Sequence, residues 1–163
     1  MITKFGTRAG ATTLLVGAVL AGVVPGAALS LAEARAPKPT KVATDLREFD
    51  ITTAKGSAKP GPVTFAMKNR GGVGHELVVV RLAQASAVLP TNPDGSVNEA
   101  AIAPADKVAE VDTVAPKQSK TLAIANLPAG SYELFCNLVD VQPDGRAVSH
   151  YKLGMHSGFT VRR

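Results

Sequence analysis

Four side chains in this sequence have the chemistry of metal ligands: His75, Cys136, His150 and Met155. One imidazole comes from the first half of the chain, whereas the other three groups fall within the last thirty residues. Two imidazoles, one thiolate and a weak thioether are a donor set that holds a single copper ion. Because Cys136 is the only cysteine, no disulfide within the chain explains it. The residue types therefore predict a mononuclear metal site.

The first 34 residues have the features of a signal peptide. A positively charged start is followed by an apolar stretch at residues 11–24, and the Ala-x-Ala pattern of residues 32–34 offers a cleavage site. An uncleaved membrane anchor is the alternative, because the uncharged residues 9–32 are numerous enough to cross a bilayer. Pro25 and the many small residues weaken that alternative. We therefore expect a signal peptide at residues 1–34 and a periplasmic or secreted protein without a membrane span.

The composition of the remaining chain limits its partners. Removal of residues 1–34 leaves 16 basic and 12 acidic residues, a net charge of +4. The basic residues are scattered, and only 4% of the whole sequence is aromatic, which disfavours nucleic-acid binding. A modest positive charge favours docking to proteins with acidic surfaces. The length suits a single domain with a real core, and we expect a monomer.

Short β-like runs separated by Gly and Pro indicate an all-β domain. Residues 35–44 are rich in Pro and Lys and are predicted to be a flexible lead-in to a domain at residues 45–163. Residues 83–107 interrupt the rhythm and are predicted to be a solvated loop. About seven to eight strands with little helical signal favour an antiparallel β-sandwich. The predicted strands are residues 45–52, 63–69, 76–82, 108–114, 119–125, 131–138 and 158–161.

The strand pattern explains how ligands distant in sequence meet. Side chains alternate along a strand, so Cys136 shares the core-facing side of its strand with Tyr132 and Leu134. His75 opens a strand directly after the glycine-rich turn of residues 70–74. The start of one strand and the end of an antiparallel neighbour lie at the same end of a sandwich. We therefore expect His75 and Cys136 to be close.

Thirteen residues separate Cys136 from His150, which is long for a compact site. The sequence Pro143-Asp144-Gly145 predicts a turn, with valines on both sides of it that can pair as a small hairpin. Such a hairpin returns His150 to Cys136. If the hairpin fails to form, His156 competes with His150 as the second imidazole.

Three stretches resemble the cupredoxin family. The stretch VTFAMKNRGGVGHELVVV at residues 63–80 is similar to the family's strand, turn and ligand histidine. The stretches LPAGSYELFCN at residues 127–137 and SHYKLGMHSGFTV at residues 149–161 resemble its closing Cys–His–Met loop. The resemblance covers about residues 45–162 and implies a Greek-key β-sandwich that binds one type 1 copper ion.

The resemblance also assigns roles to the four residues. It implies that His75, Cys136 and His150 are equatorial copper ligands and that Met155 is the axial ligand. The sequence departs from the family in two places. The segment between Cys136 and His150 is longer than in plastocyanin- or azurin-like members, and Glu76 stands where those members tend to carry Asn. The second departure puts the usual hydrogen bond beside the ligands in doubt.

Three functions follow from these residues. The leading hypothesis is an exported, non-enzymatic carrier that passes single electrons between protein redox partners as its copper alternates between Cu(I) and Cu(II). The alternative is an extracytoplasmic protein of copper storage or delivery, although three methionines are few for that role. A thiol enzyme based on Cys136 is the third, but no signature of a catalytic cysteine surrounds that residue.

Overall fold

The computed structural model describes residues 37–163 of the chain. The predicted signal peptide at residues 1–34 lies outside the described residues. Within residues 37–163 no helix is long and apolar enough to cross a membrane. The one helical element there is a single turn of 3-10 helix, η1 (Glu99–Ala101), and the remaining regular structure is β. The prediction of an all-β domain is therefore confirmed.

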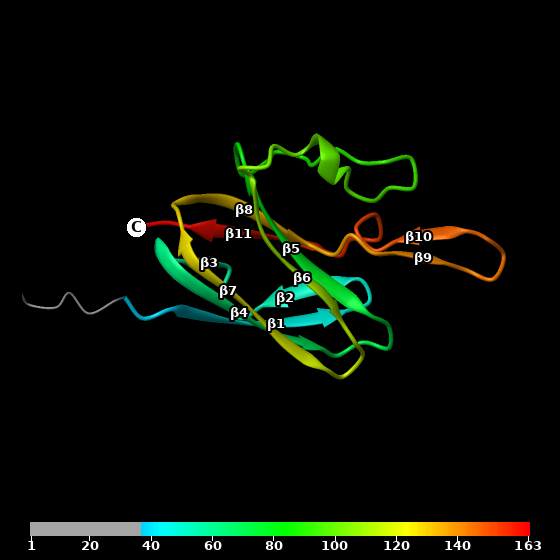
Figure 1. Cartoon of the computed structure of the whole chain (residues 1–163), viewed down its shortest axis with the longest axis horizontal. Coiled ribbons are helices and arrows are strands. Elements are labelled where there is room, and N and C mark those ends of the chain that lie inside the picture. The colour runs from blue at the N-terminus through cyan, green and yellow to red at the C-terminus, as the bar shows by residue number, and fades with distance from the viewer. Residues whose placement is uncertain (1–36) are drawn as a thin grey trace, which may run out of the picture. The chain divides into compact units, whose positions relative to one another are not determined.

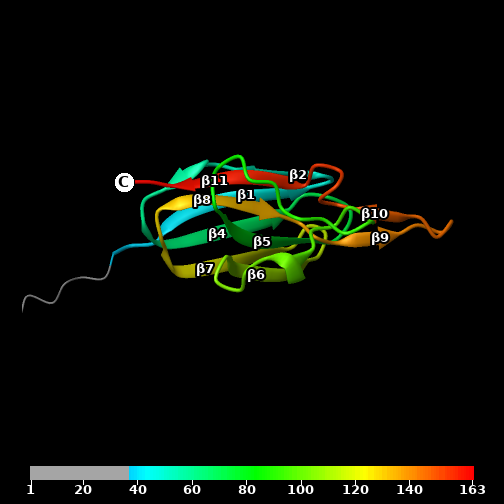
Figure 2. The same ribbon diagram turned by 90° about the horizontal axis from the view of Figure 1, so that it is seen from above.

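Two sheets pack face to face (Figures 1 and 2). The first sheet has the order β2-β1-β4-β7 and the second the order β3-β11-β8-β5-β6, whereas β9 and β10 pair with each other. In both views the β9–β10 hairpin projects beyond the sheets, at the end of the domain away from the C-terminus. The strands are β1 (Thr40–Arg47), β2 (Asp50–Thr53), β3 (Ser57–Ala58), β4 (Gly61–Asn69), β5 (His75–Leu82), β6 (Lys107–Val114), β7 (Ser119–Leu127), β8 (Gly130–Phe135), β9 (Val139–Val141), β10 (Ala147–Ser149) and β11 (His156–Val161).

The observed sandwich differs in three details from the predicted one. Pairing is mixed rather than wholly antiparallel, because β1 runs parallel to β4 and β3 runs parallel to β11. The first strand begins at Thr40, inside the predicted lead-in of residues 35–44. Eleven strands are present instead of seven or eight, since β2, β3, β9 and β10 have only two to four residues each. Runs this short carry almost no periodic signal.

Alternation of apolar side chains places the main core between the sheets. Val63, Phe65 and Met67 of β4 are buried, and the residues between them are more exposed. Across the core the ring of Phe65 meets the edge of Phe159 from β11, with 5.2 Å between ring centroids. The offset T-shaped geometry is the one that aromatic quadrupoles favour. One strand from each sheet is thereby fixed against the other.

A second, smaller core covers the outer face of β5 and β8. Val78 and Val80 point away from the main core and pack with Leu89 and Val97 from the segment between β5 and β6. In Figure 1 that segment runs above β8 as the view is drawn. Most of residues 83–107 are exposed, as expected of a solvated loop, but Leu89 and Val97 anchor the segment to the sheet, which the sequence did not predict. The continuous valine run in β5 is explained, because a strand buried on both faces has no polar side.

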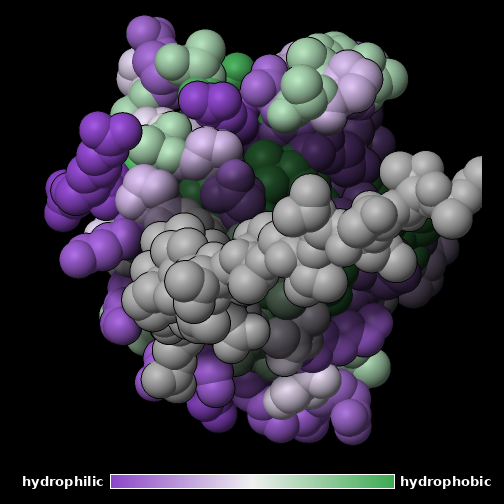
Figure 3. Space-filling model, turned by 60° about the vertical axis from the view of Figure 1, so that its left-hand side comes forward, coloured by the Kyte–Doolittle hydropathy of each residue, from purple (hydrophilic) through white to green (hydrophobic). Residues whose placement is uncertain are grey.

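Hydrophilic and apolar side chains are interspersed on the part of the surface that is coloured in Figure 3. Among the described residues the exposed large hydrophobic side chains are Val73, Val88, Val141 and Leu153. Scattered exposed apolar side chains of this kind are normal for a globular domain.

We predict that Phe65→Ala destabilises the domain by about 3–5 kcal/mol, because it removes a fully buried ring and leaves a cavity between the sheets. Urea unfolding followed by circular dichroism measures the change. Val141→Ala is the control, since that side chain is 73% exposed and its loss stays within about 0.5 kcal/mol. A cost below about 1 kcal/mol for Phe65→Ala contradicts the assigned core.

Candidate metal centre

Two strand ends bring His75 and Cys136 together. His75 is the first residue of β5, and Cys136 directly follows the last residue of the antiparallel strand β8. The backbone N–H of Glu76 points at the Cys136 sulfur, with 3.5 Å between N and Sγ. The backbone N–H of Cys136 donates in turn to the carbonyl of Met155. The start of β5, the end of β8 and the approach to β11 therefore meet at one point.

The hairpin brings His150 to the same point. Ser149 of β10 pairs with Val139 of β9, and the backbone N–H of His150 donates to the carbonyl of Leu138. Gly145 has a φ of 80° in the turn, a conformation that glycine adopts without steric cost. The predicted hairpin at Pro143-Asp144-Gly145 is confirmed, and the long spacing between Cys136 and His150 does not separate them.

Three donor atoms converge in the interior. Nδ1 of His75 lies 3.3 Å from Nδ1 of His150, and Sγ of Cys136 lies 3.3 Å from the same nitrogen. All three donor atoms lie within 4.8 Å of one another. Each of these residues has no accessible surface. A buried set of two imidazoles and a thiol is the donor combination expected of a metal site.

Met155 lies beside these donors. Its side chain is fully buried and packs in the same core cluster as Cys136. A tight turn sets its position, because its N–H donates to the carbonyl of His150 while Gly154 takes a φ of 103°. The backbone of Met155 is therefore fixed close to that of His150, and its buried thioether lies in the same core cluster as Cys136.

His156, the competing imidazole, lies apart from the converging donors. Its side chain is 45% exposed, and its Nδ1 lies 3.0 Å from a carboxylate oxygen of Glu133. His156 is the first residue of β11, where alternation turns its side chain away from the face that buries Met155. The structure thus groups His150, and not His156, with His75 and Cys136.

An asparagine fixes the turn that precedes His75. The side-chain amide of Asn69 donates to the carbonyls of Val73 and Val114, at 2.7 and 2.8 Å, and its oxygen accepts the N–H of Gly71. The side chain is fully buried, so these three bonds replace the water that it loses on folding. The position of His75 is therefore set by a satisfied hydrogen-bond network.

A carboxylate supports the same turn from outside. Glu48 accepts the N–H groups of Gly72 and Val73, and its Oε1 lies 3.8 Å from Nε2 of His75. Hydrogen bonds from its own backbone N–H and from those two residues lower the pKa of Glu48 to about 2. The side chain is therefore ionised at neutral pH and faces the outer nitrogen of His75.

Asp140 of the hairpin orients the ring of His150. Its Oδ2 lies 3.0 Å from Nε2 of His150, and the edge of the Phe49 ring packs against the same imidazole. A carboxylate accepts a hydrogen bond, so Nε2 carries the proton and the lone pair of Nδ1 faces Cys136 and His75. A carboxylate that fixes the tautomer of a ligand histidine is a recurrent feature of metal sites. The predicted hairpin already brings His150 beside Asp140, but the hydrogen bond between the two side chains depends on the exact register and was not predicted.

Glu76 occupies the place where an amide was expected. Its side chain accepts the backbone N–H of Asn137 at 2.8 Å, and its own N–H points at the Cys136 sulfur. Burial raises the pKa of Glu76, and the nearby Glu110 and Glu99 add to that effect. Glu76 therefore links the start of β5 to the residue that follows Cys136, although it is not the Asn that the family tends to carry at this position.

The electrostatics of the cluster fit a bound cation. Burial lowers the pKa of His75 and raises the pKa of Cys136 to about 11, so both side chains are neutral at pH 7. Among the described residues, Nε2 of His75 is the buried side-chain nitrogen or oxygen atom without a hydrogen-bond partner. No cationic side chain enters the cluster that the structure describes. A thiolate-preferring metal ion would supply the missing positive charge and displace the thiol proton.

Solved structures share this arrangement of strands. Rusticyanin from Thiobacillus ferrooxidans aligns with a TM-score of 0.51 and 17% identity, over 78% of this chain and 79% of its own. The chain has the cupredoxin fold. Auracyanin A, a "blue" copper protein from Chloroflexus aurantiacus, aligns with 23% identity and a TM-score of 0.49, over 77% of this chain and 100% of its own. No protein-family model and no curated protein matches the sequence.

The cupredoxin fold and the donor geometry are independent observations. The likeness to rusticyanin establishes the arrangement of the two sheets and nothing about the ligands. The convergence of two Nδ1 atoms and one Sγ follows from this chain's own strand ends and hairpin.

We predict that Asp140→Ala removes the preference of His150 for the Nε2–H tautomer in the metal-free protein, because the fixed acceptor is lost. Nitrogen-15 NMR of the imidazole measures the tautomer directly. Asp144→Ala is the matched control, since Asp144 lies in the same hairpin and contacts Arg146 instead of a histidine. An unchanged tautomer in Asp140→Ala contradicts the assigned role.

Proposed function

We propose that this protein is an extracytoplasmic, mononuclear type 1 copper protein that carries one electron at a time between redox proteins. The observation that carries the proposal is the buried convergence of Nδ1 of His75, Nδ1 of His150 and Sγ of Cys136 beside Met155. The ion would be held by these three atoms, with the thioether of Met155 as a weak fourth ligand. Bound copper would supply the reversible gain and loss of a single electron.

The chain's own residues would keep the site's geometry constant. His75 and Cys136 sit at the ends of adjacent strands, Asp140 holds the ring of His150, and a tight turn fixes Met155. Electron transfer is fast when the ligands do not rearrange between oxidation states, which is the benefit of placing them on a rigid scaffold. Burial of all four residues also excludes water from the ligand positions.

The copper assignment has further support from a neighbouring structure. Rusticyanin, which shares the fold, is described as a copper protein. The predicted signal peptide at residues 1–34 favours function outside the cytoplasm, where copper would be loaded. A net positive charge after its removal favours redox partners with acidic docking surfaces.

We predict that addition of Cu(II) to the purified protein produces an intense visible band from charge transfer between the Cys136 thiolate and copper. The band disappears in Cys136→Ala, because the sulfur ligand is gone. His156→Ala is the control and retains the band, since that imidazole lies outside the converging donors. A weak spectrum in the wild-type protein, or one that survives Cys136→Ala, contradicts the proposal.

Copper storage or delivery is the competing function. A protein that delivers copper has to release it, whereas the donors here are fully buried and held by the scaffold. Only Met67 and Met155 are methionines among the described residues, and Met67 packs in the core between the sheets. The described part of the chain therefore has no methionine-rich tract for Cu(I).

We predict that the protein retains its copper through repeated reduction and reoxidation in the presence of a Cu(I) chelator. Metal content after gel filtration measures retention, and the recovered visible band measures the intact site. Met155→Ala is an informative variant, because loss of the weak ligand alters the reduction potential while the three strong ligands remain. Complete transfer of copper to the chelator on reduction of the wild-type protein favours delivery instead.

A thiol enzyme is disfavoured by the environment of Cys136. A nucleophilic cysteine needs a lowered pKa and access to its substrate. Here burial raises the pKa of Cys136 to about 11, and the side chain has no accessible surface.

A further inference from the structure

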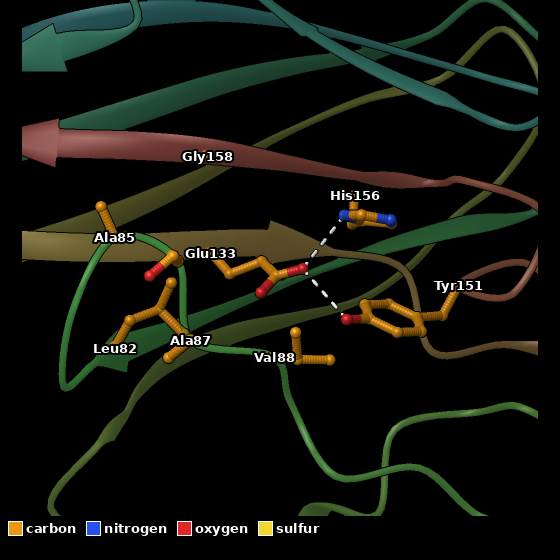
Figure 4. Close-up of a pocket in the computed structure, with 9 residues that line it drawn as sticks. Leu82, Ala85, Ala87, Val88, Glu133, Tyr151, His156 and Gly158 are labelled. Atoms are coloured by element: carbon orange, nitrogen blue, oxygen red, sulfur yellow. Dashed lines mark hydrogen bonds and ion pairs between the residues drawn. The ribbon is translucent and has the colours of Figure 1, made fainter.

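A cleft outside the metal centre has a carboxylate at its base. The cleft lies between the segment that follows β5 and the strands β8 and β11, and its volume is about 250 Å³. One wall is apolar and comes from Leu82, Ala85, Ala87 and Val88. The base is polar and comes from Glu133, Tyr151 and His156, which point toward one another in Figure 4. An apolar wall beside a few convergent polar groups is typical of a small-ligand site.

Glu133 is a buried carboxylate, and only one of its two oxygens contacts polar side chains of the cleft. The side chain is 9% exposed. Its Oε1 accepts the hydroxyl of Tyr151 at 3.1 Å and lies 3.0 Å from Nδ1 of His156. Its Oε2 accepts no hydrogen bond from any residue between 37 and 163. This oxygen is also not fully buried, because Nε2 of His75 is the atom of that segment that is both fully buried and unpaired. The second oxygen therefore opens into the cleft (Figure 4).

The free oxygen and the wall define the chemistry of a ligand. A carboxylate oxygen accepts hydrogen bonds and attracts a cation, whereas the alanine and valine side chains of the wall suit an alkyl chain. One water takes about 30 Å³ of liquid, so the cleft has room for several waters or for one lysine-sized group. We propose that this cleft binds a primary alkylammonium group, donated by a small amine or by a lysine side chain of a partner protein.

Charge balance favours a cation over a neutral ligand. Burial raises the pKa of Glu133, and the hydrogen bonds from Tyr151 and His156 and the charge of His156 offset only part of that effect. An ammonium group at Oε2 would stabilise the ionised side chain further. Among the described residues no Lys or Arg side chain forms an ion pair with Glu133. Charge-assisted hydrogen bonds of this kind are stronger than neutral ones.

The cleft is also in contact with the segment that presents the metal-site residues. Tyr151 follows His150 in the chain, and His156 follows Met155. The ring of Tyr151 packs on that of His156 with 4.8 Å between centroids, and on the edge of Phe135. A ligand at Glu133 would therefore contact the outer side of the loop that carries His150 and Met155. Binding in the cleft does not depend on the proposed copper site and is testable without metal.

The test is an NMR titration of the metal-free protein with n-butylammonium chloride at constant pH and ionic strength. Backbone amide signals of Glu133, Ala87 and Tyr151 should shift in a saturable manner. The neutral isostere 1-butanol should bind at least about tenfold more weakly, because it lacks the charge. Equal binding of the two compounds, or shifts spread evenly over the surface, overturns the proposal.

Two variants test separately how the carboxylate and the apolar wall contribute to binding. Glu133→Gln keeps the shape but removes the charge and should weaken binding at least about tenfold. Glu110→Gln is the matched control, because Glu110 does not line the cleft, and it should bind like the wild type. If Glu133→Gln does not fold, Ala87→Leu fills the cleft from its wall and should abolish binding while Glu133 remains. Wild-type affinity in either cleft variant overturns the proposal.

A second titration identifies the source of the ammonium group. Nα-acetyl-lysine amide carries the same group on a peptide backbone. Binding at least as tight as that of butylammonium supports a lysine of a partner protein, and tighter binding of butylammonium alone supports a free amine. Absence of binding by both overturns the site, and it leaves the copper spectrum and its proposal untouched.

Discussion

Two imidazoles and a thiol meet at a point without accessible surface, and the surrounding structure is built to hold them there. Burial of polar groups without partners costs about 1–3 kcal/mol for each group, and Nε2 of His75 is one such group. The scaffold tolerates this arrangement because the backbone around it is held by hydrogen bonds to Asn69 and by the hydrogen bond from Cys136 to Met155. A bound cation would replace the hydrogen bonds among the neutral donors with coordination through the two Nδ1 atoms and Sγ.

The sandwich positions the first two donors at the ends of strands, and not in loops alone. The antiparallel pairing of β5 with β8 puts His75 and Cys136 at the same end, and the hairpin returns His150 to them. Both faces of β5 and β8 are buried, one by the main core and one by the segment of residues 83–107. The strands that present the first two donors are therefore held from both sides, which limits their movement.

Regular periodicity made many of the strands and the hairpin turn predictable from the sequence. The alternation at residues 63–69 and the valine run at residues 76–82 gave the correct strands, and Gly145 identified the hairpin turn. The predicted strand at residues 45–52 covers the end of β1 and most of β2, and its start was placed five residues late because a proline-rich segment precedes Thr40. Parallel pairing of β1 with β4 is set by long-range packing, which no local pattern records.

Hydrogen bonds between side chains on different strands could not be predicted from the sequence. Asp140 meets His150 only because of the hairpin register, and Glu133 meets Tyr151 and His156 only because β8 pairs with β11. The most direct test of the metal centre is a crystal of the copper-loaded protein measured at the copper absorption edge. The account predicts one anomalous peak, within bonding distance of Nδ1 of His75, Nδ1 of His150 and Sγ of Cys136. A peak elsewhere, for example between Glu133 and His156, would contradict it.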